Sequence, residues 1–420
     1  MFGSIWKSYT GIVSNSTALN VTGNNLANMN TVGFKRSSAD FHTLMTNIAR
    51  NSGNGNPIQI GLGSHTAAIS PVFSQGNLTE TGRPTNVALQ GNGFFMVNRG
   101  ANTHYTRAGN FVLNSAGQLV TPDGSSVQGY TSRDESGNII TNGAVTDITV
   151  DFEEFSEPRR TQLVRYVSNL NPTSEPGEVV ASEIDIFDGQ GEARTLTLRF
   201  TKTDTPGVWD YEFELEGGEV ANGTGRATFH QDGTLATLNG QDVSDPNFTN
   251  PVLDLGSLDN GAPDFQVTWD VVQVGAGSEG ANKTLITNYN ADSIASTVFQ
   301  DGAGIGELES VGFNQDGVLV GTYTNGEIQN LAQLAIAFFN NNEGLKQTGN
   351  GLFSETTASG AATLNPNSGT RFLGNTVETS NVDVATEFVD LIFHQRAYQG
   401  NTRSVNTSNQ ILQEILGLKR

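Results

Sequence analysis

The sequence of 420 residues contains no cysteine. It therefore has no disulfide framework, no thiolate metal site and no cysteine nucleophile. No stretch approaches the roughly 18 consecutive apolar residues of a membrane-spanning helix, because the best run covers only residues 334–339. The first residues contain a single lysine, Lys7, and no continuous apolar segment, so we expect no cleaved secretion signal. Membrane insertion is not predicted.

Histidine is also scarce. The five histidines lie at least 23 residues apart in the sequence and form no H-E-x-x-H spacing: His42, His65, His104, His230 and His394. The chain has no G-x-S-x-G elbow either, so both metal ligation and nucleophilic hydrolysis lack their usual signatures. The sequence therefore predicts no catalytic residue, no metal site and no cofactor.

Two short patterns could still be interpreted as sites. Residues 275–280 match G-x-G-x-x-G, but the residues after them do not begin a helix, which a dinucleotide site needs for its phosphates. Asp151, Glu153 and Glu154 could supply paired carboxylates for glycoside cleavage, but a solvated turn accounts for them far better. We interpret both segments as loops and expect no enzyme.

Basic residues are few, and the net charge is −21. Residues 1–50 and 376–420 together carry 8 basic and 6 acidic side chains, so the ends sum to +2. The remaining 14 basic and 37 acidic residues give the middle of the chain −23. An acidic middle argues against nucleic acid and anionic membranes as partners.

Glycine is abundant, with 49 residues, and the middle of the chain alternates apolar and polar positions. A polar-x-Gly-x-apolar element recurs at residues 115–119, 135–139, 232–235 and 316–319. Glycine supplies the positive φ that tight hairpin turns require, so these sites predict hairpins. A calcium loop needs several oxygens at fixed spacing, and no D-x-D-x-D-G stretch is present.

These patterns predict a mainly β protein with terminal α-helices. We expect a discontinuous inner β domain that carries an inserted outer β domain, with one short helix at residues 331–339. The expected boundaries are these: N-terminal coiled-coil helix 1–30, connecting segment 31–70, inner β domain 71–156 plus 291–375, outer β domain 157–290 and C-terminal coiled-coil helix 376–420.

Apolar residues repeat every seven positions at both ends of the chain. The expected assembly interface consists of Ile5, Tyr9, Ile12, Leu19, Leu26, Val384, Phe388, Leu391, Tyr398, Val405, Leu412 and Leu416. A seven-residue repeat forms a seam along one helix face that must meet another helix. We expect Ser380 or Asn381 to cap the C-terminal helix, with Asp383 in its first turn and Gly417 at its end.

Several segments resemble the flagellar axial rod and hook family. Residues 18–35 and 380–398 are similar to its two terminal signatures, and residues 91–97 and 105–111 to its inner β domain. The signature residues are Asn24, Asn25, Leu26, Ala27, Asn28, Gly33, Phe34, Lys35, Gln395, Arg396, Ala397 and Tyr398. The insert at about 157–290 is typical of the longer hook members rather than of the short distal rod members.

The resemblance implies an extracellular homopolymer: a curved, flexible tube that transmits torque from rod to filament, with the terminal helices paired at its core. It implies the hook cap, distal rod and hook–filament junction proteins as partners, and type III export of an unfolded chain. Some spirochaete hooks of this family cross-link their subunits through cysteine and lysine, which a chain without cysteine cannot do. A distal rod protein and a secreted β-rich glycan-binding or glycan-cleaving protein are the alternatives.

We predict that both ends are largely disordered in the dilute monomer and become helical against copies of themselves. The N-terminal 28 residues are rich in serine, threonine and asparagine, which are poor helix formers. A pair of helices folded within one chain is the alternative. Far-UV circular dichroism should show a stronger helical signal in the polymer than in the monomer; equal signals would contradict the prediction.

Overall fold

The computed structural model describes residues 2–417 except 52–56, 101, 135–136, 153–154, 246, 274–282 and 365–368. The chain forms two compact units. Unit 1 comprises Met1–Phe152, Ser310–Gly321 and Ile328–Arg420, and unit 2 comprises Glu153–Glu309 and Thr322–Glu327. The predicted fold class is confirmed: terminal helices frame a mainly β chain in which a second β unit is inserted. The G-x-G-x-x-G segment and Glu153–Glu154 lie outside the described residues.

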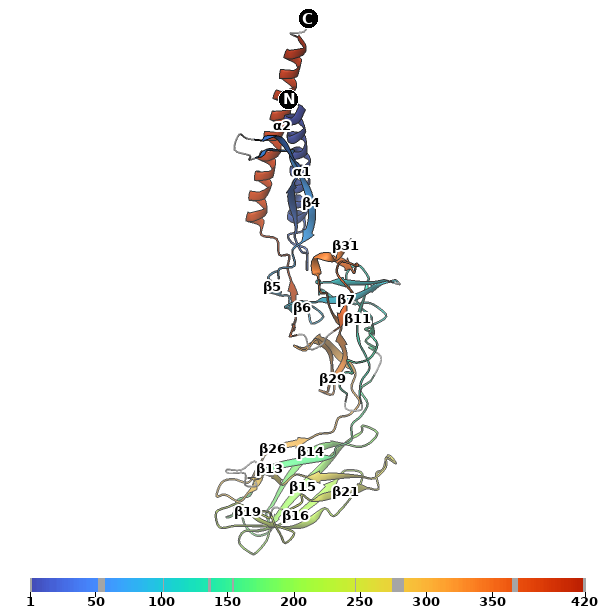
Figure 1. The fold of residues 1–420 in the computed structure, drawn as a ribbon. Helices are drawn as coiled ribbons and strands as arrows, with labels where there is room; N and C mark the ends of the chain where they lie inside the picture. The colour runs from blue at the N-terminus through green and yellow to red at the C-terminus, as the bar shows by residue number, and fades with distance from the viewer. Residues whose placement is uncertain are drawn as a thin grey trace. The chain divides into compact units, whose positions relative to one another are not determined.

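Helices α1 (Phe2–Ala27) and α2 (Val384–Gly417) lie side by side in unit 1 (Figure 1). The predicted cap of α2 was wrong. Asp383 is the N-cap, because its Oδ1 accepts a hydrogen bond from the Thr386 N–H at 2.7 Å. Asn381 instead accepts from the Arg36 N–H and donates to the Val72 carbonyl, so its side chain is already used by the chain before the helix. A local sequence pattern cannot indicate these two contacts of Asn381, because Arg36 and Val72 are distant from it in the sequence.

Two antiparallel strand pairs follow α1. The first, β1 with β4, contacts α1 (Figure 1). The second, β2 with β3, continues from it. The bounds are β1 Ser37–Thr43, β2 Thr46–Asn51, β3 Pro57–Gly61 and β4 Ser64–Pro71.

The remaining strands of unit 1 form a β body. Its main sheet has the order β27-β28-β29-β11-β7-β8-β32-β31, and β9, β10, β12, β30 and β33 pair beside that path. Two short pairs, β5 with β35 and β6 with β34, join early and late parts of the chain. The bounds are β5 Leu78–Glu80, β6 Val87–Gln90, β7 Phe94–Arg99, β8 Asn102–Thr106, β9 Val112–Leu113, β10 Leu119–Val120, β11 Ser126–Tyr130, β12 Thr146–Asp147, β27 Leu308–Phe313, β28 Val318–Tyr323, β29 Ile328–Leu334, β30 Ile336–Phe338, β31 Lys346–Gly349, β32 Leu352–Ser354, β33 Thr363–Leu364, β34 Arg371–Gly374 and β35 Thr376–Glu378; a 3₁₀ turn spans Asn342–Gly344.

The helix predicted at residues 331–339 is wrong, because β29 and β30 occupy this segment. β29 pairs with β11, and β30 pairs with β7 and β33. Successive residues from Leu331 to Ala337 are buried apart from Gln333, so both faces of the segment are covered. A continuous apolar run of this length does not distinguish a buried helix from a buried strand. Here pairing with β11 and β7 makes the segment a strand.

The described part of unit 2 contains two six-stranded β-sheets around an aromatic core, and a short pair of β23 with β24. One sheet has the order β17-β21-β22-β13-β25, with β26 also paired to β13, and the other has the order β14-β15-β16-β18-β19-β20. Trp269 packs between Tyr211 and Phe213, with ring centroids 5.0 Å from each. The bounds are β13 Leu163–Asn169, β14 Val179–Phe187, β15 Ala193–Lys202, β16 Val208–Leu215, β17 Glu219–Ala221, β18 Thr224–Phe229, β19 Leu235–Leu238, β20 Gln241–Asp242, β21 Val252–Gly256, β22 Phe265–Trp269, β23 Val272–Gln273, β24 Lys283–Thr284, β25 Ile286–Thr287 and β26 Ile294–Gln300.

The predicted turns are confirmed. Gly117, Gly137, Gly233 and Gly317 all have positive φ, between 73° and 84°. At Gly117 a Cβ would lie 1.9 Å from the Val150 carbonyl oxygen, so glycine is required there for space as well as for φ.

Lys202 in β15 is a buried charge in unit 2. Its side chain is 5% exposed, and its Nζ has no hydrogen-bond partner among the described residues. The ammonium lies 5.1 Å from the centroid of the Trp209 ring, and burial lowers the pKa of Lys202. A cation over an aromatic face recovers only part of what the ammonium loses by leaving water.

We expect Lys202→Met to stabilise unit 2 by about 1–3 kcal/mol, because it removes an unsatisfied buried charge and keeps the apolar stem. Urea unfolding followed by tryptophan fluorescence measures this. With its lowered pKa, Lys202 makes the native protein gain stability as the pH rises towards the ordinary lysine pKa, and the variant should lose that pH dependence. The exposed Lys283→Met change is the control and should leave the midpoint unchanged. A lower midpoint for Lys202→Met would refute the argument.

Candidate assembly surface

The contact between α1 and α2 is narrow and polar. Ser8 Oγ lies 3.0 Å from Ser404 Oγ, and a Cβ on Gly11 would lie 2.7 Å from Asn401 Nδ2. The buried positions of α1 are small or polar: Ser8, Thr10, Gly11, Ser14, Ala18, Thr22 and Asn25. Small residues let two helices approach closely, and they leave no room for large apolar side chains in the seam.

The large apolar side chains lie on the other faces of the two helices. On α1 the exposed residues are Trp6, Tyr9 and Val13, here called the outward α1 patch. On α2 four of the exposed ones cluster within residues 388–393, namely Phe388, Val389, Ile392 and Phe393, here called the outward α2 patch. Trp6 is 55% exposed and Phe393 69% exposed. Exposed apolar residues clustered on one element mark an interaction surface.

The sequence-predicted interface residues are divided between these regions. Four are exposed: Tyr9, Val384, Phe388 and Tyr398. Seven are half-buried: Ile5, Ile12, Leu19, Leu26, Leu391, Val405 and Leu412. The side chain of Leu416 lies outside the described residues. None of the described ones is fully buried, so each retains surface for a partner.

Sequence reasoning missed five of the seven outward patch residues: Trp6, Val13, Val389, Ile392 and Phe393. A seven-residue repeat selects one row of a helix, whereas residues 388–393 are apolar at every position except Asp390. A helical segment that is apolar all round is buried on all sides in its final environment. The sequence of residues 388–393 therefore already indicated that this part of the helix contacts more than one other helix.

A buried charge cluster joins the helices to the β body. Lys35 Nζ lies 2.6 Å from Glu378 Oε1, and Arg107 Nη1 lies 3.5 Å from Glu378 Oε2. Lys35 is 1% exposed and Glu378 is fully buried. Lys35 also donates to the Ser74 carbonyl at 2.8 Å, and the Gly76 N–H donates to Glu378 Oε1 at 2.8 Å. Burial lowers the pKa values of Lys35 and Arg107, and the Glu378 carboxylate opposes both shifts.

A second group of polar contacts lies beside this cluster, at the start of α2. Asn25 Nδ2 donates to Glu387 Oε2 at 3.1 Å and to the Ser37 carbonyl at 2.9 Å. The Ser37 N–H donates to Asn25 Oδ1, and Arg36 Nη1 lies 3.7 Å from Glu387 Oε1. One asparagine therefore links α1, β1 and α2.

The N-terminal signature has a structural explanation in part. Gly33 has φ +69°, and a Cβ there would lie 2.4 Å from the Ala108 N atom, so only glycine fits. Lys35 belongs to the buried charge cluster, and Asn25 to the group of polar contacts at the start of α2. Phe34 and Asn28 are half-buried and, with the exposed Asn24, line a hollow of about 430 Å³ beside β31 and β32.

The C-terminal signature contrasts with the N-terminal one. Gln395, Arg396 and Tyr398 are exposed on α2, and Ala397 is half-buried. Leu26 is half-buried, and Ala27 ends α1 with its side chain exposed. Contacts within the single chain do not explain these residues, which directs attention to contacts between chains.

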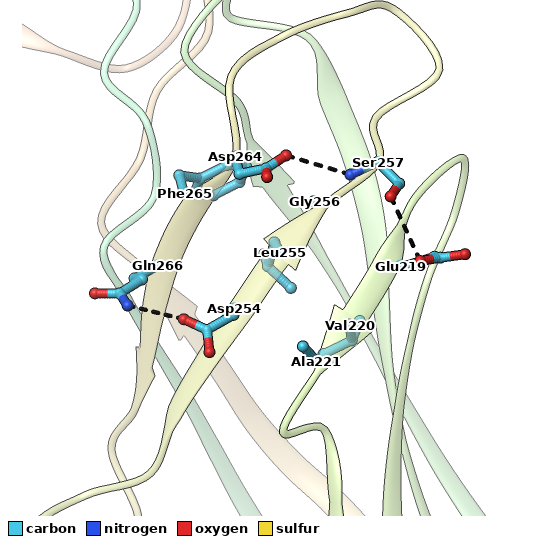
Figure 2. A pocket seen from close by; sticks show the side chains of 10 residues that line it. All are labelled: Glu219, Val220, Ala221, Asp254, Leu255, Gly256, Ser257, Asp264, Phe265 and Gln266. Carbon is cyan, nitrogen blue, oxygen red and sulfur yellow. Dashed lines mark hydrogen bonds between the residues drawn. The ribbon is translucent and has the colours of Figure 1, made fainter.

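The described residues offer little for catalysis. A hollow of about 620 Å³ in unit 2 is lined by residues of β17, β21 and β22 and by the turn after β21 (Figure 2). Its acidic side chains accept hydrogen bonds from neighbours: Asp254 from Gln266 at 2.8 Å, Asp264 from the Ser257 N–H at 3.3 Å and Glu219 from Ser257 Oγ at 3.4 Å. Within the described part of the chain no group of three His, Asp or Glu side chains could hold a metal ion.

No described helix is both long enough and apolar enough to cross a membrane.

Comparisons with known proteins identify the class. Four family models match in order along the chain: Flagella basal body rod protein (residues 11–35), Flagellar hook protein FlgE/F/G D1 domain (88–153), Flagellar basal body protein FlaE D2 domain (158–303) and Flagellar basal body rod FlgEFG protein C-terminal (374–418). These matches define an axial protein of the bacterial flagellum.

Individual relatives narrow this class. The flagellar hook protein FlgE of Borreliella burgdorferi is 32% identical over the whole of both chains. That of Treponema pallidum is 31% identical, also over the whole of both. That of Escherichia coli is 30% identical over 98% of this chain and 99% of its own. The chain belongs to the flagellar hook protein family, which is structural.

Glu378→Gln should destabilise unit 1 by about 3–5 kcal/mol, because it leaves Lys35 and Arg107 buried without their counter-charge. Chemical unfolding of the purified monomer measures this. Arg99→Gln is the matched control: it breaks a half-exposed ion pair with Asp123 in the same unit (3.9 Å) and should change stability little. Equal losses of stability from the two changes would show that the buried charge cluster does not hold the helices to the β body.

Proposed function

We propose that this chain is the structural subunit of the flagellar hook, polymerising through its terminal helices into a curved tube. The observation that carries the proposal is the arrangement of α1 and α2, which place small polar residues between them and large apolar residues outward. A soluble helix pair has the opposite arrangement. Copies of the same chain supply the missing cover, and the helices pair as a coiled coil in the core of the tube.

The rest of the molecule suits a flexible joint. The helix packing supplies the continuous, strongly held part of the tube. The β surfaces carry most of the negative charge and many polar turns, so their contacts between subunits are small and wet. Such contacts break and re-form as the hook rotates, which lets the tube bend while it transmits torque from rod to filament.

The setting follows from the same proposal. The chain is exported unfolded by the flagellar type III apparatus and assembles outside the cell, without catalysing a reaction. Its partners are other copies of itself, the hook cap, the distal rod and the hook–filament junction proteins. The distal rod alternative is disfavoured by the match of residues 158–303 and by full-length similarity to hook proteins. A glycan-binding monomer has no support from these relatives.

The test is polymerisation of truncated chains. Removing the two helices alone, residues 1–27 and 384–420, keeps Glu378 beside Lys35 and Arg107. This truncation should abolish tubes in negative-stain electron microscopy and leave a soluble β protein, because the helices supply the core contacts. Tubes formed by the truncated chain would contradict the proposal. A truncated chain that still binds glycan would favour the alternative.

A matched control removes β structure instead. The Arg159 N–H donates to the Ala303 carbonyl and the Ala303 N–H donates to the Arg159 carbonyl, both at 2.8 Å. Replacing residues 160–302 by an Asn-Gly turn therefore closes an existing antiparallel bridge. This variant should still polymerise, with altered curvature or stiffness.

A further inference from the structure

Two histidines lie directly opposite each other in the strand pair β1–β4. In the antiparallel register His42 pairs with His65, and their ring centroids are 6.3 Å apart with an interplanar angle of 89°. The two residues are 23 positions apart in the chain, so no local spacing indicates a site, and only the pairing of the strands brings them together. The Cβ atoms of directly opposite residues are about 4.5–5.5 Å apart, which lets both side chains reach one point.

Both histidines project from the face of the strand pair that points away from the helices. The neighbouring pair, Phe41 opposite Thr66, lies on the other face: the Phe41 ring is 6.2 Å from the ring of His394 in α2, and Thr66 Oγ1 is buried. Successive residues of a strand point to opposite faces, so His42 and His65 share the outer face. Both are exposed there.

The ring nitrogens of this pair are available to a ligand. Apart from the contact between the two rings, neither His42 nor His65 forms a hydrogen bond or an ion pair with any residue that the structure describes. The other histidines differ from this pair. His394 Nδ1 lies 3.4 Å from Asn15 Oδ1, and Nδ1 of His104 is buried.

Two adjacent imidazoles are a chelating group for divalent transition metals. Imidazole nitrogen is a preferred ligand of Zn²⁺, Ni²⁺ and Cu²⁺, at about 2.0–2.1 Å for zinc. Because both side chains are exposed, rotation about their side-chain bonds brings one nitrogen of each ring to a shared ion. Among the described residues no third His, Asp or Glu joins the two, so water fills the remaining positions of the ion. Ca²⁺ and Mg²⁺ prefer oxygen ligands, and this pair does not suit them.

We propose that His42 and His65 bind one divalent transition-metal ion, which holds β1 and β4 together. A pair of two strands is only marginally stable by itself. An ion that binds the paired strands and not the separated ones shifts the equilibrium towards the paired form. Because β1 and β4 both contact α1, the ion stabilises the connecting segment in the form that packs beside this helix.

Titration calorimetry of the untagged, full-length chain with Ni²⁺ tests the site. The wild-type chain should bind one ion at this pair. His42→Asn and His65→Asn should each weaken this binding about 100-fold, because a second ligand on the same chain binds a shared ion intramolecularly. Ca²⁺ should give no binding that depends on these two residues.

Two further variants are the controls. His230→Asn removes an exposed histidine of unit 2 and should leave the binding of Ni²⁺ unchanged. The double variant His42→Asn/Thr43→His keeps the number of histidines but places one on the opposite face of β1, so it should bind as weakly as His42→Asn. Wild-type binding no tighter than that of His42→Asn, or full binding by the double variant, would overturn the metal site.

Amide hydrogen exchange tests whether the ion holds the strands together. Saturating Ni²⁺ should slow the exchange of residues 39–43 and 64–68 in the wild-type chain and not in His42→Asn. Tight binding of Ni²⁺ at the pair without slower exchange in these strands would show that the ion does not stabilise them, and would overturn that part of the inference.

Discussion

The close approach of α1 and α2 is the constraint on which the rest of the structure depends. Gly11 against Asn401 and Ser8 against Ser404 leave no volume between the helices for a large side chain. The largest apolar side chains of both helices, such as Trp6 and Phe393, therefore lie exposed on the outside of the pair. Their exposure leaves apolar surface of the free subunit in contact with water, and burial of apolar area is the main driving force for association. The small residues at the helix contact thus favour assembly, because they leave the large apolar side chains outside the pair.

The second requirement is that the helix pair leaves the β body at a defined angle. Three segments of the chain meet between the helices and the β body: Gly33–Lys35, residues 72–76 and the segment from Glu378 to Asn381. The Gly33 N–H donates to the Glu378 carbonyl at 2.8 Å, so the first and last of these segments are bonded to each other. Buried polar networks whose members are satisfied fix one geometry. In the proposed tube this joint transmits force between the helical core and the β units.

Much of the fold could be predicted from the sequence, because its signals are local. The hairpin turns depend on glycines with positive φ, and the terminal helices on apolar spacing. The segment 331–339 was misjudged because its conformation depends on β11 and β7, which are distant in sequence. Glu378 was missed for the same reason: its partners, Lys35 and Arg107, lie at least 271 residues away in the chain. The contact face of α1 was also missed, since it is marked by small residues rather than large ones.

Amide hydrogen exchange, compared between monomer and assembled tube, tests the central claim most directly. If the helix pair is completed only by neighbouring subunits, amides of α1 and of residues 384–400 should exchange fast in the monomer and slowly in the tube. Amides of β14–β16 in unit 2 should be protected in both, because their core is complete within one chain. Protection of both helices in the monomer equal to that in the tube would contradict the account.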